Sequence, residues 1–248
     1  MKTSIANRNL ISYSVWGFSI ICWFILLYNP GNLLAAAHCQ MALCDGSSAS
    51  LKILLKTNPF SEMMTGWLLM VLAMMLPKLI IPIQIIINQS FKNMRFLMSI
   101  LFVTGYVLMW TIAGLLLNIL IFFVSIKMPG SFTPAVIFGI ITLVWQFSPM
   151  KQKCLNRGHY HPVLAAWGLK AYQGAFSFGL THGFWCVGAG WALMLFPMVL
   201  PQGHHAAMLI VTFIMLSEHM EHPQVPRWRI DLRLKLLRII IPVNSLRR

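Results

Sequence analysis

The sequence predicts an all-α membrane protein, a bundle of about six transmembrane helices followed by an amphipathic helix on the membrane surface. Hydrophobic residues make up 58% of the 248 residues and charged residues only 10%, whereas a soluble domain has about 25% charged residues. Several apolar stretches approach the length of about 20 residues that a helix needs to cross the hydrocarbon core. We therefore expect the lipid bilayer to be the main partner of the chain.

The apolar stretches predict the individual spans. The first could be read as a signal peptide, but its apolar run is long and no small-residue cleavage site follows closely, so we expect it to be retained as a helix. The fourth and sixth are the shortest. The predicted spans cover about residues 13–28, 63–87, 96–126, 134–147, 172–197 and 205–217.

Basic residues predict the orientation of these spans. The formal net charge is +14, and most of the Lys and Arg side chains lie in short loops on one side or in the C-terminal tail. With the N-terminus inside, only Lys52, Lys56 and Lys127 face out, and Lys78 falls within the second span. This is the positive-inside pattern, which predicts a multi-pass protein of the bacterial inner (plasma) membrane with both termini cytoplasmic. It also argues against nucleic acid as a partner.

The C-terminal tail, residues 227–248, differs from the transmembrane domain, residues 1–226. It reads RWRIDLRLKLLRIIIPVNSLRR, with basic and apolar residues interleaved. This pattern is typical of an amphipathic helix on the anionic inner leaflet. A disordered basic tail is the alternative.

A titratable pair lies in the fifth span. His182 and Cys186 are four residues apart in a stretch without charges, so a helix places them on one face. Imidazole and thiol at membrane depth are usually functional and are ligands for copper or zinc. The alternatives are a histidine bonded to a neighbouring carbonyl and a cysteine that only packs. Gly179 and Gly183 form a GxxxG pattern, which lets a second helix approach closely.

The second span carries methionines on one face. Met70 and Met74 lie on a stripe of the predicted helix, and their thioethers could relay Cu(I) towards the pair in the fifth span. Methionine also fills gaps between packed helices, which is the alternative interpretation.

Potential ligands also occur on both sides of the membrane. The first outer loop carries His38, Cys39 and Cys44, which could bind copper or zinc, although Cys39 and Cys44 could instead form a disulfide. On the inner side, we expect a second cluster in the loop after the fourth span and at the end of the sixth. Its alternative is a polar helix end that pairs with basic residues. The candidate ligands there are Cys154, Glu218, His219 and His222.

Four separated segments resemble one known family. They are WLLMVLAMMLP, WQFSPMKQKCL, GAFSFGLTHGFWCVGAGWALM and the last helix, which ends at Glu218. In this order they resemble the bacterial predicted metal-binding integral membrane proteins, a family of unknown function, over about residues 66–218. The resemblance implies a membrane location and a bound metal, and it adds Met194 to the candidate ligands. The matching positions include Trp67, Met70, Met74, Pro77, Gln146, Lys151, Cys154, His182, Gly183, Cys186, Gly188, Trp191, Met194, Met208 and Glu218.

The chain departs from that pattern mainly at thiols. The family usually has cysteines where this chain has Gly158, Ala189 and Gly190, whereas His204 and His219 replace an Asn and a Lys. A site rebuilt with imidazole would shift its preference from Cu(I) towards Zn(II) or Cu(II). Loss of the metal function is the alternative.

No enzyme signature is present. The chain has no Walker A loop, no GxSxG elbow and no HExxH motif, so ATP-driven pumping and familiar hydrolysis are not expected. We expect a membrane protein that binds a transition metal, copper first and zinc second, and that handles or transports the ion through a bundle lined by Met, His and Cys. A metallochaperone or another membrane subunit is the expected protein partner. The alternatives are a membrane thiol-disulfide oxidoreductase using Cys39 and Cys44, and a structural or assembly subunit of a membrane complex.

Overall fold

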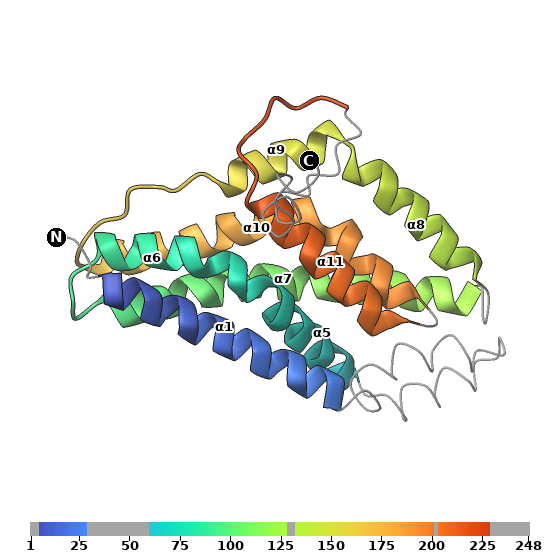
Figure 1. Ribbon diagram of the computed structural model, residues 1–248, viewed down its shortest axis with the longest axis horizontal. Coiled ribbons are helices and arrows are strands. Elements are labelled where there is room, and N and C mark those ends of the chain that lie inside the picture. Colours follow the sequence, from blue (N-terminus) through green and yellow to red (C-terminus); the bar gives the residue numbers. More distant parts are fainter. Residues whose placement is uncertain (1–4, 29–59, 128–131, 201–202, 229–248) are drawn as a thin grey trace, which may run out of the picture.

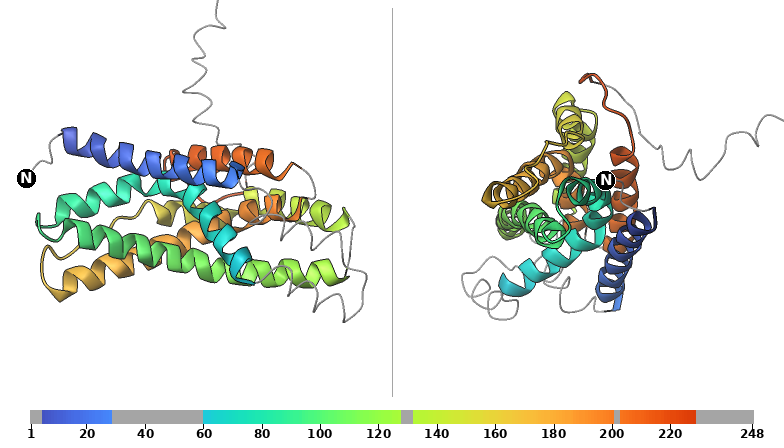
Figure 2. Two further views of the ribbon diagram at one scale, coloured as in Figure 1. Left: turned by 90° about the horizontal axis from the view of Figure 1, so that it is seen from below. Right: turned by 90° about the vertical axis from the view of Figure 1, so that its left-hand side faces the viewer.

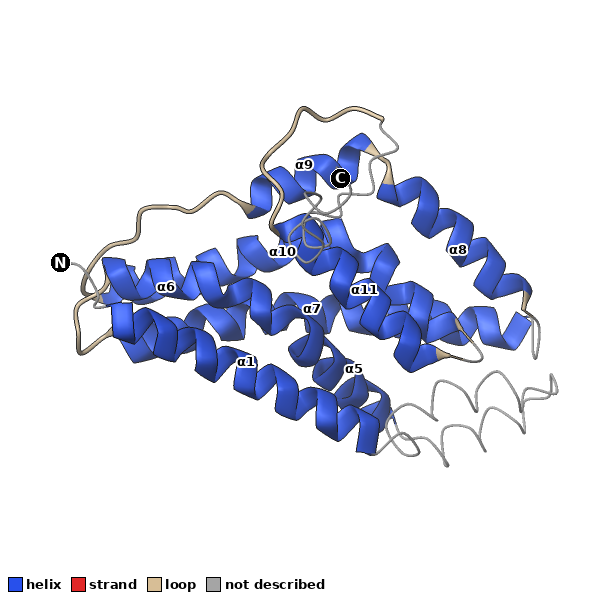
Figure 3. Cartoon of the chain, in the orientation of Figure 1, coloured by secondary structure: helices blue, strands red, loops and turns tan. Residues whose placement is uncertain are grey.

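A computed structural model describes residues 5–28, 60–127, 132–200 and 203–228, and in these ranges the chain is helical, with no strand (Figures 1 and 3). The prediction of an all-helical fold is therefore confirmed for this part of the chain. The outer loop with His38, Cys39 and Cys44 and almost all of the basic tail lie outside the described residues. The elements are α1 (Ile5–Tyr28), α5 (Phe60–Met75), the 3₁₀ helix η1 (Leu76–Leu79), α6 (Ile80–Gln89), α7 (Arg95–Lys127), α8 (Thr133–Gln146), α9 (Pro149–Gly158), α10 (Leu169–Val199) and α11 (His204–His219).

Two long helices, α7 with 33 residues and α10 with 31, pack side by side through the length of the bundle (Figure 2). Glycines allow their close approach. A Cβ atom on Gly179 would lie 2.2 Å from the carbonyl oxygen of Phe102, and one on Gly183 would lie 2.9 Å from Cβ of Met109. The expected role of the GxxxG pattern is confirmed, because only glycine leaves room for the neighbouring backbone.

The predicted second span is a broken helix. It runs through α5, η1 and α6, and the break follows from Pro77 near the start of η1, since proline cannot donate the backbone hydrogen bond that would continue the α-helix. Lys78 lies in this break and is only 6% exposed. The hydroxyl of Ser19 in α1 donates to the carbonyl oxygen of Ala73 at 2.6 Å, which joins the first helix to the end of α5.

Four helices in the described part of the chain are long and apolar enough to cross a membrane. They correspond to predicted spans one, two, three and five. The fourth predicted span differs, because α8 ends at Gln146 and the chain bends by 64° into α9, so that the pair resembles a broken span or a re-entrant loop. Ser148 begins α9, since its side chain accepts a hydrogen bond from the backbone N–H of Lys151 and Pro149 follows at the first helical position. The sixth predicted span corresponds to α11, with 16 residues.

Helices α8 and α11 both end beside the middle of α10 (Figure 1). The Trp145 indole donates to the carbonyl oxygen of Gly188 at 3.1 Å, and a Cβ atom on Gly190 would lie 2.3 Å from Cε of Met215. The sequence predicted Cys154 in a loop, but it lies buried in α9, with its sulfur 2.8 Å from the position of a Cβ on Gly188. These contacts pack α9 and α11 against α10.

The core is rich in sulfur. Trp67 and Trp110 pack with ring centroids 6.1 Å apart, and the Trp67 indole donates to the carbonyl oxygen of Trp110 at 2.8 Å. Elsewhere in the core, flexible thioethers fill the irregular spaces between crossing helices. The buried methionines are Met70, Met74, Met75, Met98, Met194, Met198, Met208 and Met215.

Candidate metal centre

His182 and Cys186 lie on the face of α10 that meets α7, and both contact Tyr106. The His182 ring is 5.9 Å from the Tyr106 ring, centroid to centroid, and it also packs against the rings of Phe102 and Phe178. The sulfur of Cys186 lies 3.2 Å from the phenol oxygen of Tyr106, and either group could be the donor. The helical spacing and the close approach of α7 thus bring an imidazole, a thiol and a phenol together.

The imidazole of His182 is buried without a hydrogen bond at Nδ1. The side chain is 5% exposed, and no polar atom within the described residues pairs with this nitrogen. The alternative of a ring bonded to a neighbouring carbonyl therefore has no support at Nδ1. A buried ring nitrogen without a partner is costly, and a bound ligand would remove that cost.

A cavity of about 530 Å³ reaches His182. Its walls come from the end of α9, the segment that follows α9, and one face of α10. The guanidinium carbon of Arg157 lies 5.5 Å from the centroid of the Trp185 ring, so this cation stacks over an aromatic face at the cavity wall. The cavity is lined by Arg157, Tyr160, Pro162, Val163, Leu164, Gly174, Ser177, Phe178, Thr181, His182 and Trp185.

Glu218, a predicted metal ligand, is paired with a buried lysine. Its Oε1 atom lies 2.7 Å from Nζ of Lys151, with side-chain exposures of 2% and 0%. Lys151 also donates to Oε1 of Gln146 at 2.5 Å, and the Gln146 amide donates to the same carboxylate oxygen. This arrangement joins α8, α9 and α11, as the polar alternative for the inner cluster suggested. The pairing with Lys151 in particular was not predicted, since 67 residues separate the two partners.

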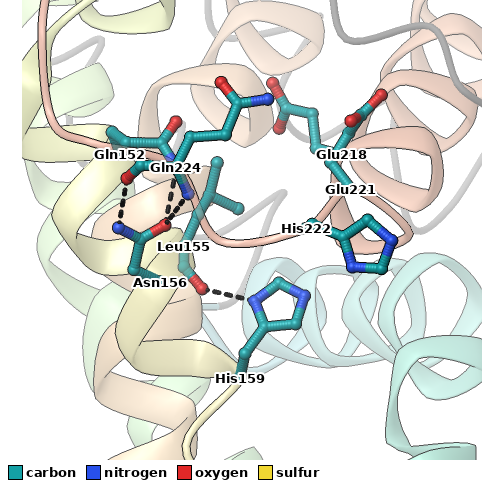
Figure 4. A pocket seen from close by; sticks show the side chains of 8 residues that line it. All are labelled: Gln152, Leu155, Asn156, His159, Glu218, Glu221, His222 and Gln224. Atoms are coloured by element: carbon teal, nitrogen blue, oxygen red, sulfur yellow. Dashed lines mark hydrogen bonds between the residues drawn. The ribbon is translucent and has the colours of Figure 1, made fainter.

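Two of the inner candidates, Glu218 and His222, line a small space (Figure 4). Its volume of about 10 Å³ is about the minimum that admits one water molecule, and His159 also lines it. Asn156 donates to the carbonyl oxygen of Gln224 at 2.6 Å and accepts from its backbone N–H at 3.1 Å, which closes one side.

His219, also a predicted ligand, stacks on His159 with ring centroids 5.5 Å apart. Burial, with His159 as a smaller cause, lowers the pKa of His161, which lies in the segment after α9. This imidazole is therefore neutral at physiological pH, which is the form that binds metals.

The comparison with known families decides the class of protein. Residues 64–230, well over half of the chain, match the family PpoB2, which is described as a copper chaperone. The chain belongs to the PpoB2 family. No curated protein and no solved structure matches it. The copper description of the PpoB2 family agrees with the metal-related resemblance and with copper as the first predicted metal, ahead of zinc.

The PpoB2 match contains most of the predicted ligands but not those of the first outer loop. The predicted ligands within it are Met70, Met74, Cys154, His182, Cys186, Met194, Glu218, His219 and His222. His38, Cys39 and Cys44 precede residue 64 and lie outside both the match and the described residues. The thiol-disulfide alternative depended on these two cysteines.

The structure does not assemble the predicted ligands into one cluster. Within the described ranges, no three His, Cys, Asp or Glu side chains are placed so that they could hold a metal together. Met70 and Met74 are buried on α5, which packs mainly against α1 and α7, and Met194 is buried on α10. Tyr106 and Arg157 were not predicted, because a pattern of metal-ligand residue types does not include them.

Proposed function

We propose that the protein is an integral membrane copper chaperone that holds Cu(I) between His182 and Cys186. The observation that carries this proposal is the buried His182 ring, which has no partner at Nδ1, lines a cavity and lies one helical turn from a thiol. Membership of the PpoB2 family supports copper as the cargo.

The side chains of His182 and Cys186 are suited to binding Cu(I) reversibly. Imidazole and thiolate are ligands that Cu(I) accepts. The phenol of Tyr106, 3.2 Å from the sulfur, can donate a hydrogen bond to Cys186 and so help to orient the sulfur. A chaperone must also release its ion, and a two-ligand site leaves an open coordination position where a ligand from a partner can bind before the first ligands leave. Such a pair is consistent with transfer to a protein partner.

We further propose that this bundle spans the bacterial plasma membrane with the N-terminus inside. Four candidate spans and the asymmetry of basic residues support this orientation. Phe132 and Trp167 are exposed at opposite ends of the bundle, before α8 and α10 respectively. In a chain in which Cys39 and Cys44 are serine, we expect an impermeant maleimide on intact cells to label Phe132→Cys and not Trp167→Cys. The reverse labelling would contradict the orientation.

The copper site is tested by the copper content of the purified protein. After anaerobic loading with Cu(I) in detergent and removal of excess metal, we expect about one copper ion per wild-type chain. His182→Ala and Cys186→Ser should each lose most of this copper while remaining monodisperse, because each removes one of two ligands. Cys22→Ser and His205→Ala are matched controls on α1 and α11. Full copper retention in both α10 variants would refute the proposal.

A further inference from the structure

The cavity that leads to His182 carries a positive charge, which is unfavourable for the entry of a bare copper cation. Arg157 is the one permanently charged side chain among the residues that line it, and these residues include no carboxylate. The nearest buried cation on the same short helix, Lys151, is already neutralised by Glu218. A bare cuprous ion would therefore meet a positive charge at the cavity wall, with no anion beside it to offset the repulsion.

The size of the cavity also favours a ligand larger than a bare metal ion. A volume of about 530 Å³ falls within the range of about 300–1,000 Å³ that small-molecule sites occupy. A single metal ion needs far less room. The walls also combine aromatic surface from Trp185 and Phe178 with the hydroxyls of Ser177 and Thr181, which is the mixture that small polar molecules require.

We propose that copper reaches His182 as an anionic Cu(I)–bis-thiolate complex of a small thiol, which Arg157 recognises. This inference rests on the proposed function and names the form in which the cargo arrives. Two thiolates give Cu(I) a net charge of −1, so the guanidinium attracts the complex that carries the ion. Stacking on Trp185 orients the guanidinium at the cavity wall, and Trp185 directly precedes Cys186 in α10.

The transfer is a ligand exchange without a change in oxidation state. One Cu–S bond to the donor breaks as a Cu–N bond to His182 forms, and the second breaks as the Cys186 sulfur binds. The proton of the Cys186 thiol passes to one released thiolate. The products are copper held by His182 and the Cys186 thiolate, one free thiol and one free thiolate, so that the net charge of −1 is conserved.

The test compares two copper donors of opposite charge. Apo-protein in detergent is mixed anaerobically either with the Cu(I)–glutathione complex, which is anionic, or with the Cu(I)–acetonitrile complex, which is cationic, and the rate of copper uptake is measured. We expect Arg157→Gln to slow uptake from the glutathione complex about tenfold, in the range of electrostatic effects on association. Uptake from the acetonitrile complex should be unchanged or faster. Lys153→Gln, an exposed lysine on the same helix, is the matched control and should leave both rates unchanged.

Two further outcomes separate this inference from the proposed function. If the wild-type protein takes up copper in a His182-dependent manner but Arg157→Gln affects both donors equally, or neither, the inference is overturned and the copper site stands. If His182→Ala takes up copper as fast and as fully as the wild-type protein from both donors, the proposed function itself fails. A tenfold effect that shrinks as salt rises would support recognition by charge rather than a change in shape.

Discussion

Replacing Glu218 with glutamine is expected to lower the free energy of unfolding by about 3–5 kcal/mol, the usual cost of removing one partner of a buried ion pair. The reason is Lys151, whose side chain is fully buried 2.7 Å from the carboxylate and would lose its counter-ion. Glutamine conserves the volume of glutamate, so that the loss reports charge rather than a cavity. The measurement is unfolding in mixed micelles followed by helical circular dichroism.

A double variant shows whether the pair is needed for folding. Because replacing both members of a buried pair is often close to neutral, Lys151→Met combined with Glu218→Gln should recover much of the stability that Glu218→Gln loses. Lys153→Gln removes an exposed charge from the same helix and should change stability by no more than about 0.5 kcal/mol. A loss in Glu218→Gln as small as this control would contradict the buried pairing.

Gly179→Ala is expected to destabilise the packing of α7 against α10 by about 3 kcal/mol, at the upper end of overpacking costs. The added Cβ would lie 2.2 Å from the carbonyl oxygen of Phe102 and 3.1 Å from its Cα, so the backbone of α7 would have to move. Thermal stability in detergent and the monodisperse fraction measure this effect.

Two other glycines of α10 provide graded controls for this change. In Gly190→Ala the clash is with the end of the flexible Met215 side chain, and in Gly174→Ala the nearest atom is Cδ2 of Leu164 at 3.4 Å. We therefore expect Gly179→Ala to cost the most, Gly190→Ala less and Gly174→Ala almost nothing. Equal effects at Gly174 and Gly179 would show that α7 and α10 do not approach as described.

Local patterns predicted the central part of this architecture. The spacing of His182 and Cys186 placed them on one face of a helix, and the GxxxG pattern at Gly179 indicated a close helix neighbour; the structure adds that this neighbour is α7. These features depend on residues within two turns of each other, so periodicity is enough to find them.

Long-range features were beyond sequence reasoning. Hydropathy does not distinguish an apolar helix that crosses a bilayer from one such as α8, which ends beside the middle of α10 and continues into α9. The pairing of Lys151 with Glu218 and the stacking of Arg157 on Trp185 depend on how distant segments pack. Burial of the α5 methionines agrees with both a copper relay and a packed core, so their position does not distinguish these two roles.

X-ray absorption at the copper edge, on the wild-type protein loaded with Cu(I), reports directly which atoms bind the ion. We expect a low-coordinate Cu(I) shell that contains both nitrogen and sulfur. The sulfur contribution should disappear in Cys186→Ser, and the imidazole scattering should disappear in His182→Ala, in whatever copper those variants retain. A wild-type shell without sulfur, or a spectrum that neither substitution changes, would contradict a copper site formed by His182 and Cys186.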